Sequence, residues 1–165
     1  MALRTILTEG DPMLRKKCRP VGEVTERIQM ILDDLVDTMR DAEGVGLAAP
    51  QVGILRRMFV AEPEPEEVYY FVDPQITSQE GELEGDEGCL SVPEMVGTVI
   101  RPEKITITGL DREGNPQTHT FEGFHARVMC HEYDHLDGIL YPDKAEKMYR
   151  VDPEAQQEQE EEEKA

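Results

Sequence analysis

His131-Glu132-Tyr133-Asp134-His135 is the segment that constrains the fold and the chemistry of this chain most strongly. Side chains four residues apart lie on one face of an α-helix, so the imidazoles of His131 and His135 can reach the same metal ion. Glu132 would lie beside that ion and can accept a proton from water bound to it. The segment therefore predicts a helix that supports metal-assisted hydrolysis.

The helix predicted around this segment runs from residue 123 to about residue 137, and Gly138 is typical of a helix end. One of its faces carries two apolar side chains followed by the two imidazoles: Phe124, Val128, His131 and His135. We interpret this face as an apolar pocket wall that leads into a metal site. The alternative, two core histidines satisfied by hydrogen bonds, does not explain the matched spacing or the glutamate between them.

Two histidines leave a catalytic metal site short of one protein ligand, because such sites use about three protein ligands and one water. Downstream of the helix the chain offers Glu146 and further acidic residues, but no histidine. Upstream, Cys89 lies in Glu87-Gly88-Cys89-Leu90-Ser91, and a thiol bound to a divalent ion is deprotonated. A lone cysteine is more often a small buried hydrophobic residue, so both interpretations of Cys89 remain open at this point.

The rest of the pattern predicts one more helix and several strands. Residues 25–43 carry apolar residues at helical spacing: Ile28, Leu32, Leu35, Val36 and Met39. Thr25 is suited to cap the start of this helix and Gly44 to end it. Residues 58–61, 69–73, 104–110 and 117–121 have the composition or alternation of strands, and the last two flank a turn at 111–114. No strand–helix–strand alternation is present, so we predict an α+β fold without a parallel sheet.

Composition limits the class of protein. The chain has 36 acidic and 17 basic residues among 165, a formal net charge of −19, so we expect no specific nucleic-acid partner. Its three cysteines form no CxxC pair, which favours reduced thiols and a cytoplasmic location. No apolar segment has the length of a signal-peptide core or of a membrane span, so we expect no membrane association.

The charge is uneven along the chain. We expect one domain over residues 1–148 and an acidic C-terminal tail over residues 149–165. Within residues 152–165 the acidic residues are accompanied by a single basic residue, Lys164: Asp152, Glu154, Glu158 and Glu160 to Glu163. Such a segment is typical of a frayed helix or a disordered region in water.

Three motifs, in this order, carry a resemblance to a known family. They are Gly44-Val-Gly-Leu-Ala-Ala-Pro-Gln51, Glu87-Gly-Cys-Leu-Ser91 and His131-Glu-Tyr-Asp-His135-Leu-Asp-Gly138. Together with Asp11-Pro-Met-Leu-Arg15, they make the chain resemble peptide deformylases over roughly residues 5 to 145. The resemblance implies antiparallel sheets packed around a central C-terminal helix that carries the histidines, with an amphipathic N-terminal helix.

The resemblance also implies a role for each site residue. Cys89, His131 and His135 would hold one divalent metal ion, natively iron(II), with zinc, nickel or cobalt also accepted. Glu132 would act as general base and then as general acid. The side-chain amide of Gln51 and the backbone N–H of Leu90 would stabilise the oxyanion. The substrate would be bound by residues from two motifs and the helix: Val45, Gly46, Phe124 and Val128. Arg101 would pair with Glu87 and brace the cysteine segment.

The implied activity is removal of the N-formyl group from the N-terminal formylmethionine of newly synthesised proteins, with release of formate. The partners would be N-formylmethionyl nascent polypeptides in the cytoplasm. A transient ribosome contact is compatible with this activity, but not through the acidic tail, which ribosomal RNA would repel.

Two positions depart from the expected pattern. The family usually has glutamine before the first histidine of the third motif, whereas this chain has Cys130. Arg127 either lines the mouth of the pocket or extends into solvent, and the sequence does not decide between these placements.

Three other functions are compatible with parts of the pattern. A zinc endoprotease of the His-Glu-x-x-His type would take its third ligand from downstream, and a structural or storage module would close its site with four protein ligands. An inactive deformylase-like protein is disfavoured, because every reactive position is filled.

Overall fold

The computed structural model describes residues 2–151, so residues 152–165 of the expected acidic tail lie outside the described residues. The helices are α1 (Glu26–Asp41) and α2 (Gly123–His135). The strands are β1 (Gly46–Ala48), β2 (Met58–Glu64), β3 (Glu67–Glu80), β4 (Leu83–Cys89), β5 (Val92–Arg101), β6 (Lys104–Leu110), β7 (Pro116–Glu122) and β8 (Lys147–Arg150). Short 3-10 turns lie at Pro12–Arg15, Ala49–Val52 and Tyr141–Asp143.

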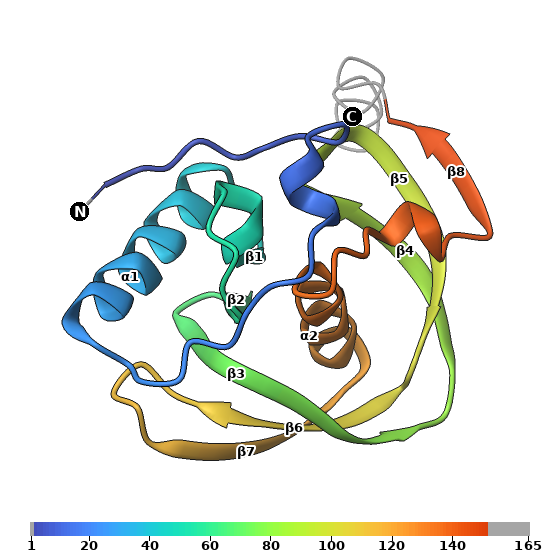
Figure 1. Cartoon of the computed structure of the whole chain (residues 1–165). Coiled ribbons are helices and arrows are strands. Elements are labelled where there is room, and N and C mark those ends of the chain that lie inside the picture. Colours follow the sequence, from blue (N-terminus) through green and yellow to red (C-terminus); the bar gives the residue numbers. More distant parts are fainter. Residues whose placement is uncertain (1, 152–165) are drawn as a thin grey trace, which may run out of the picture.

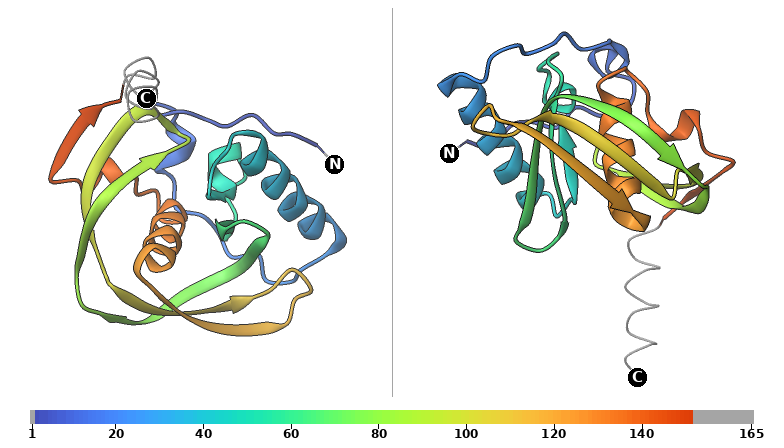
Figure 2. Two further views of the ribbon diagram at one scale, coloured as in Figure 1. Left: turned by 180° about the vertical axis from the view of Figure 1, so that it is seen from behind. Right: turned by 90° about the horizontal axis from the view of Figure 1, so that it is seen from below.

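The strands form two antiparallel sheets around α2. One sheet has the order β1-β2-β3-β6-β7 and the other β4-β5-β8. Figure 1 shows α2 at the centre, the sheets curving around it and α1 on the outer side of β1 and β2. The reverse and lower views show the same enclosure of α2 (Figure 2). The predicted α+β class and its antiparallel sheets around a central helix are therefore confirmed.

Strand β2 is buried on both faces, and this fixes how the two helices are placed. Met58 and Val60 pack in the cluster that contains the apolar stripe of α1. Phe59 and Ala61, which point the opposite way, pack in the cluster that contains the apolar residues of α2. The β1–β2 pair thus lies between the two helices and packs against both, and β1 lies close to α2.

The helix ends follow from local chemistry. The Thr25 hydroxyl accepts a hydrogen bond from the Ile28 backbone N–H at 3.3 Å, which caps α1. Helix α2 ends at His135, about two residues before the end predicted above. Gly138 follows with φ 74°, and a Cβ at this position would lie 2.5 Å from the Arg15 carbonyl oxygen. Only glycine therefore fits where the chain leaves α2.

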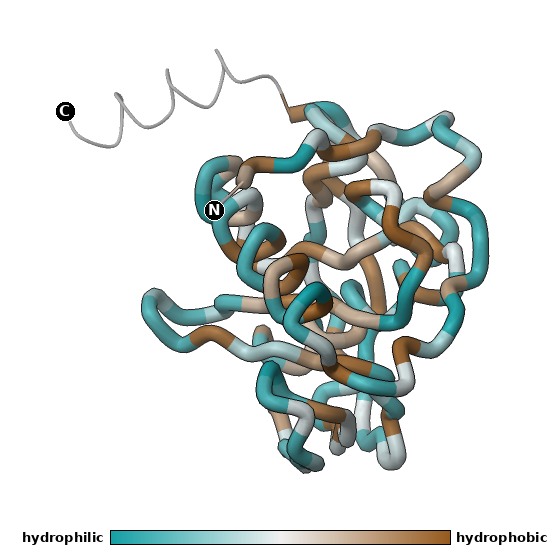
Figure 3. The backbone as a smooth tube through the Cα atoms, turned by 60° about the vertical axis from the view of Figure 1, so that its left-hand side comes forward, coloured by the Kyte–Doolittle hydropathy of each residue, from teal (hydrophilic) through white to brown (hydrophobic). Residues whose placement is uncertain are grey.

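The second sheet contains strands that the sequence pattern does not predict. Strand β4 carries glycines and acidic residues without clear alternation, and Cys89 is its last residue. Strand β8 pairs Tyr149 and Arg150 with β5, so this sheet continues past the domain boundary expected at residue 148. Figure 3 shows hydrophobic stretches on the inner elements and hydrophilic loop tips at the periphery. Among residues 2–151, no helix combines the length and apolar composition needed to cross a membrane.

Candidate metal centre and substrate cavity

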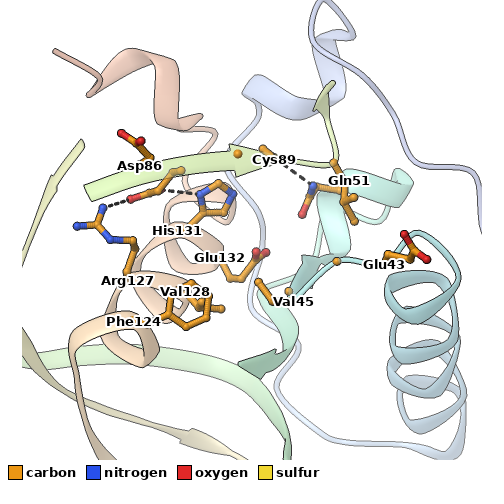
Figure 4. Close-up of a pocket in the computed structure, with 15 residues that line it drawn as sticks. Glu43, Val45, Gln51, Asp86, Cys89, Phe124, Arg127, Val128, His131 and Glu132 are labelled. Carbon is orange, nitrogen blue, oxygen red and sulfur yellow. Dashed lines mark hydrogen bonds and ion pairs between the residues drawn. The ribbon is translucent and has the colours of Figure 1, made fainter. Parts of the chain in front are cut away.

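A cavity of about 340 Å³ opens between β1, the end of β4 and one face of α2 (Figure 4). Nine of the ten residues expected at the site line it: Val45, Gly46, Gln51, Cys89, Leu90, Phe124, Val128, His131 and Glu132. The tenth, His135, lies against Cys89, with its Nε2 3.5 Å from the thiol Sγ. The fold thus brings all three motifs and the face of α2 together.

Three metal-ligating side chains converge at one end of this cavity. The Cys89 Sγ and one ring nitrogen each of His131 and His135 all lie within 4.8 Å of one another. The two Nε2 atoms are 3.3 Å apart, so both imidazoles present the same nitrogen to one point. Both histidines are buried on consecutive turns of α2, whereas Cys89 reaches the point from the end of β4.

The donor set suits a divalent ion such as zinc or iron(II), because it combines one thiolate with two imidazoles. The His131 Nδ1 lies 2.9 Å from the Glu87 Oε1, so Nδ1 donates to this carboxylate and Nε2 is directed at the cluster, as in a metal-binding histidine. Burial lowers the pKa of His135, which keeps this imidazole neutral and able to act as a ligand. The residues present therefore fit the metal site that the motifs imply.

Glu87 is itself held by a buried ion pair. Arg101 donates from Nε and Nη2 to the two carboxylate oxygens of Glu87, at 2.8 and 2.9 Å. The pairing of Arg101 with Glu87 predicted above is confirmed. Burial alone would raise the pKa of Glu87, but the hydrogen bonds from Arg101 and His131 outweigh burial and hold that pKa far below its usual range. Glu87 is therefore ionised and available to orient His131.

Glu132 lies on the cavity side of the metal cluster. Its side chain is buried, and its Oε2 has no hydrogen-bond partner among the described residues. Burial raises the pKa of Glu132 to about 7. A buried carboxylate with one free oxygen, beside a candidate metal point, is suited to accept and return a proton near neutral pH.

Gln51 aims its amide nitrogen at the same end of the cavity. Its Oε1 accepts from the Ala48 backbone N–H at 2.9 Å, which fixes the orientation of the amide. Its Nε2 donates to the Ser91 hydroxyl at 3.0 Å and lies 3.6 Å from the Cys89 Sγ. Leu90 lies in the turn after β4 and also lines the cavity. An N–H donor is thus held beside the cluster, opposite Glu132 (Figure 4).

The apolar part of the cavity lies farther along α2. Val128 is buried, whereas Phe124 and Val45 are about half exposed at the rim, on α2 and just before β1. Figure 4 shows Val45 facing Phe124 and Val128 across the opening. This part of the cavity can receive an apolar side chain while the polar end faces the cluster.

The structure adds residues whose place the sequence did not decide. Arg127 lines the cavity, but its guanidinium is buried rather than at the mouth or in solvent. Arg127 lies four residues before His131 and therefore on the same face of the helix, and this spacing was the sequence signal that could have predicted its placement near the site. Ser91 is fully buried, and its hydroxyl accepts a hydrogen bond from the Gln51 amide. Its position two residues after Cys89 in the sequence does not reveal this contact. Cys130 is buried on α2 but does not line this cavity.

Comparisons with known proteins agree on one family. The family described as polypeptide deformylase matches residues 3–151. The chain is similar to a peptide deformylase of Symbiobacterium thermophilum, with 44% identity over 97% of this chain and 75% of the relative. It is also similar to one of Caldanaerobacter subterraneus subsp. tengcongensis, with 49% identity over 87% of this chain and 90% of the relative.

Solved structures give the same result. The crystal structure of peptide deformylase from Thermotoga maritima has a TM-score of 0.84 and 34% identity, and covers 93% of this chain and 100% of that chain. A peptide deformylase from Legionella pneumophila has a TM-score of 0.84 and 42% identity, and covers 95% of this chain and 90% of that chain.

Proposed function

This chain belongs to the peptide deformylase family of hydrolases, and on that premise we propose that it removes the N-formyl group from the N-terminal formylmethionine of newly synthesised proteins, releasing formate. One observation carries the proposal: Cys89, His131 and His135 meet beside a buried Glu132 with a free carboxylate oxygen, at the end of a cavity with apolar walls. That combination suits hydrolysis of a small amide next to an apolar side chain.

The family uses a divalent metal, and we assign its ligands to Cys89, His131 and His135. Iron(II) is the ion proposed for the native enzyme, and zinc, nickel or cobalt are the alternatives that the same donors accept. When bound, the ion supplies Lewis acidity, which polarises the formyl carbonyl and makes water more acidic.

Glu132 moves the proton in this proposal. Its carboxylate accepts a proton from the attacking water and then delivers it to the nitrogen of the leaving amine. A pKa of about 7 suits both steps. The carboxylate is then a stronger base than that of an exposed glutamate, and the protonated carboxyl group is a stronger acid than an ammonium group. Because Glu132 is buried, bulk water does not compete for this proton.

Gln51 and Leu90 stabilise the negative charge that develops on the formyl oxygen. The Gln51 amide is already oriented by Ala48 and Ser91, so it needs no reorganisation when charge appears. The backbone N–H of Leu90, next to Cys89, is the second proposed donor. Two donors held near the cluster account for a few kcal/mol each of transition-state stabilisation.

The remaining residues orient the substrate. We assign the methionine side chain to the apolar part of the cavity between Val45, Phe124 and Val128. Gly46 lets the substrate backbone approach β1 closely, because it has no side chain. Discrimination by such an apolar pocket is modest, roughly 1–3 kcal/mol for a methylene-sized change.

The test is formate release from formyl-Met-Ala-Ser, with acetyl-Met-Ala-Ser as the matched control substrate. We expect formate from the first peptide and no acetate from the second. Absence of formate release by anaerobically prepared protein with a stoichiometric metal content would overturn the proposal.

Two variants separate this function from its competitors. Cys89→Ala should lose the metal, whereas an endoprotease with a downstream ligand would keep it. Glu132→Gln should keep the metal and lose about 10²–10⁴-fold in turnover, the usual contribution of a general base. A structural metal module would lose nothing in the second variant.

The proposed partners are N-formylmethionyl nascent polypeptides in the cytoplasm. We also propose that any transient contact with the ribosome does not use residues 152–165. Their seven acidic residues and one lysine would be repelled by ribosomal RNA phosphates.

A further inference from the structure

We infer that Arg127 is a positioning residue for the metal centre: it fixes Glu87, and through Glu87 the imidazole of His131, relative to the strand that carries Cys89. This inference rests on the metal site proposed above. It concerns a residue that is neither one of the three proposed metal ligands nor in contact with the proton-transfer residue Glu132.

The first observation is that Glu87 has no unused acceptor site. Its Oε1 accepts from Arg101 and from the His131 Nδ1, both at 2.9 Å. Its Oε2 accepts from the Arg101 Nε at 2.8 Å and from the Arg127 Nη1 at 2.7 Å. A carboxylate offers about four lone-pair sites, so these four bonds leave Glu87 a single orientation. The bond from Arg127 is the shortest of the four.

The second observation is that the Glu87 carboxylate binds side chains from two successive turns of α2. Arg127 and His131 are four residues apart on one face of this helix, and both bind the same carboxylate. In Figure 4 each is joined by a dashed line to that carboxylate. Arg127 therefore ties Glu87 to the turn of α2 that precedes the first histidine.

The third observation is that Arg127 also binds the backbone of the second sheet. Its Nη2 donates to the Leu83 carbonyl at 2.7 Å and its Nη1 to the Val99 carbonyl at 3.1 Å. These carbonyls belong to β4 and β5, and β4 ends at Cys89. The guanidinium thus links the helix that carries two ligands to the hairpin that carries the third.

The fourth observation is that the chain leaves space for this guanidinium. A Cβ at Gly85 would lie 2.9 Å from the Arg127 Nη2 and 3.0 Å from its Cζ. The arginine side chain is 7% exposed, so it cannot move aside into solvent without losing its partners. Gly85 and Arg127 therefore form a fitted pair that fixes where the guanidinium lies.

Arg101, the last residue of β5, does not make Arg127 redundant, because the two arginines link the β4–β5 hairpin to different turns of α2. Arg101 binds Glu87 and, through Nη1 at 2.6 Å, Asp134, which lies three residues after His131 on α2. Arg127 alone joins Glu87 to the backbone of β4 and β5 among these contacts. Without Arg127, the Oε2 of Glu87 loses a charged donor and the carboxylate can rotate. The His131 ring would then be less well oriented toward the ion.

The experiment measures the ion rather than the activity. Wild type and Arg127→Met are loaded with cobalt(II), their absorption spectra are recorded, and cobalt release is followed after a chelator is added. We expect release about 10–100-fold faster in Arg127→Met, together with shifted ligand-field bands, as for loss of an outer partner of a metal-binding histidine. Arg127→Lys should lie between the two, because one ammonium can reach Glu87 but cannot also bind both carbonyls.

Arg112→Met is the matched control. Arg112 makes a bidentate pair with Asp33, at 2.8 Å for both contacts, and lines no part of the cavity. Its loss should leave cobalt release and the spectrum unchanged, whatever its effect on the melting temperature. If Arg127→Met does not fold, Gly85→Ala provides the same test, because its Cβ displaces the guanidinium while every polar group remains.

The outcomes are separable from those of the proposed function. If wild type shows no thiolate-to-cobalt charge transfer, the metal assignment fails first. If wild type binds cobalt through Cys89 but folded Arg127→Met and Gly85→Ala release it at the wild-type rate with unchanged spectra, the inference about Arg127 is overturned.

Discussion

The carboxylate of Glu132 lies against the backbone of Gly46, and a Cβ at position 46 would come within 2.6 Å of its Oε1. Gly46 is in β1 and Glu132 is in α2, so this contact joins the first and third sequence motifs. Strand β1 therefore limits where the proton-transfer group can lie.

Gly46→Ala should displace the Glu132 carboxylate without disturbing the fold. Gly46 is not among the glycines with positive φ, so alanine fits its backbone conformation, and the three atoms nearest to the added methyl, at 2.6 to 2.9 Å, all belong to the Glu132 side chain. Misplacement of a reacting group by about 1 Å costs on the order of 10²-fold in rate, so we expect a loss of that order in kcat. Formate-release kinetics measure the loss, with the metal content held equal.

A double-mutant cycle shows whether this loss acts through Glu132. In a Glu132→Gln background, where the proton-transfer group is absent, Gly46→Ala should cause little further loss. Equal losses in both backgrounds would mean that the methyl group blocks the substrate instead.

Gln51→Leu should reduce kcat by about 10²–10³-fold, the usual cost of removing one oxyanion donor. It should also destabilise the protein by about 1 kcal/mol, because the buried Ala48 N–H loses its acceptor. Ser91→Ala is the matched control, since it removes a partner of the Gln51 amide but keeps the amide and its bond to Ala48. If both variants have the same kcat, the donor role of Gln51 is wrong.

The parts of the site that follow from sequence are those with local signals. Helical spacing places His131, Glu132 and His135 on adjoining positions of α2, as the structure shows. Alternation and a turn signal place the β6–β7 hairpin within one residue of its observed ends. In both cases the determining contacts join residues close in the chain.

The parts that do not follow depend on partners far along the chain. Strand β4 carries Asp86 and Glu87, and an acidic run with glycines gives no strand pattern. Glu87 is buried there only because Arg101 and Arg127 neutralise it. An arginine on a helix ordinarily extends into water, so the burial of Arg127 depends on carbonyls of β4 and β5 that no local pattern reveals.

Iron-loaded protein should lose activity in air faster than under nitrogen, because iron(II) and a thiolate ligand are both oxidised by oxygen. Oxygen adducts should form at Cys89 rather than at Cys18 or Cys130, since burial raises the pKa of each of the latter thiols to about 11. Residue-resolved mass spectrometry after timed exposure measures this. Equal activity of aerobic and anaerobic iron-loaded samples would contradict the prediction.

Deletion of residues 152–165 should leave ribosome binding unchanged or slightly stronger. The segment removed carries seven acidic residues and one lysine, so its removal takes away repulsion from RNA phosphates. Co-sedimentation with ribosomes at two salt concentrations measures the effect. A truncated chain that binds ribosomes more weakly would show that the segment contributes to docking.

Glu87→Gln should destabilise the metal-free protein at neutral pH, and less so in acid. The folded pKa of Glu87 lies below its unfolded value, so its pairing contributes fully above about pH 4.5 and is lost as the pH falls further. Breaking a buried ion pair costs about 3–5 kcal/mol, which is the difference in unfolding free energy expected at pH 7. Urea denaturation of wild type and variant between pH 7 and about pH 3.5 should show this difference shrinking toward the acid end, where Glu87 of the unfolded wild-type chain binds a proton and the variant has no carboxylate to protonate. A difference that stays constant over this range would mean that Glu87 stabilises the fold through packing rather than through its charge.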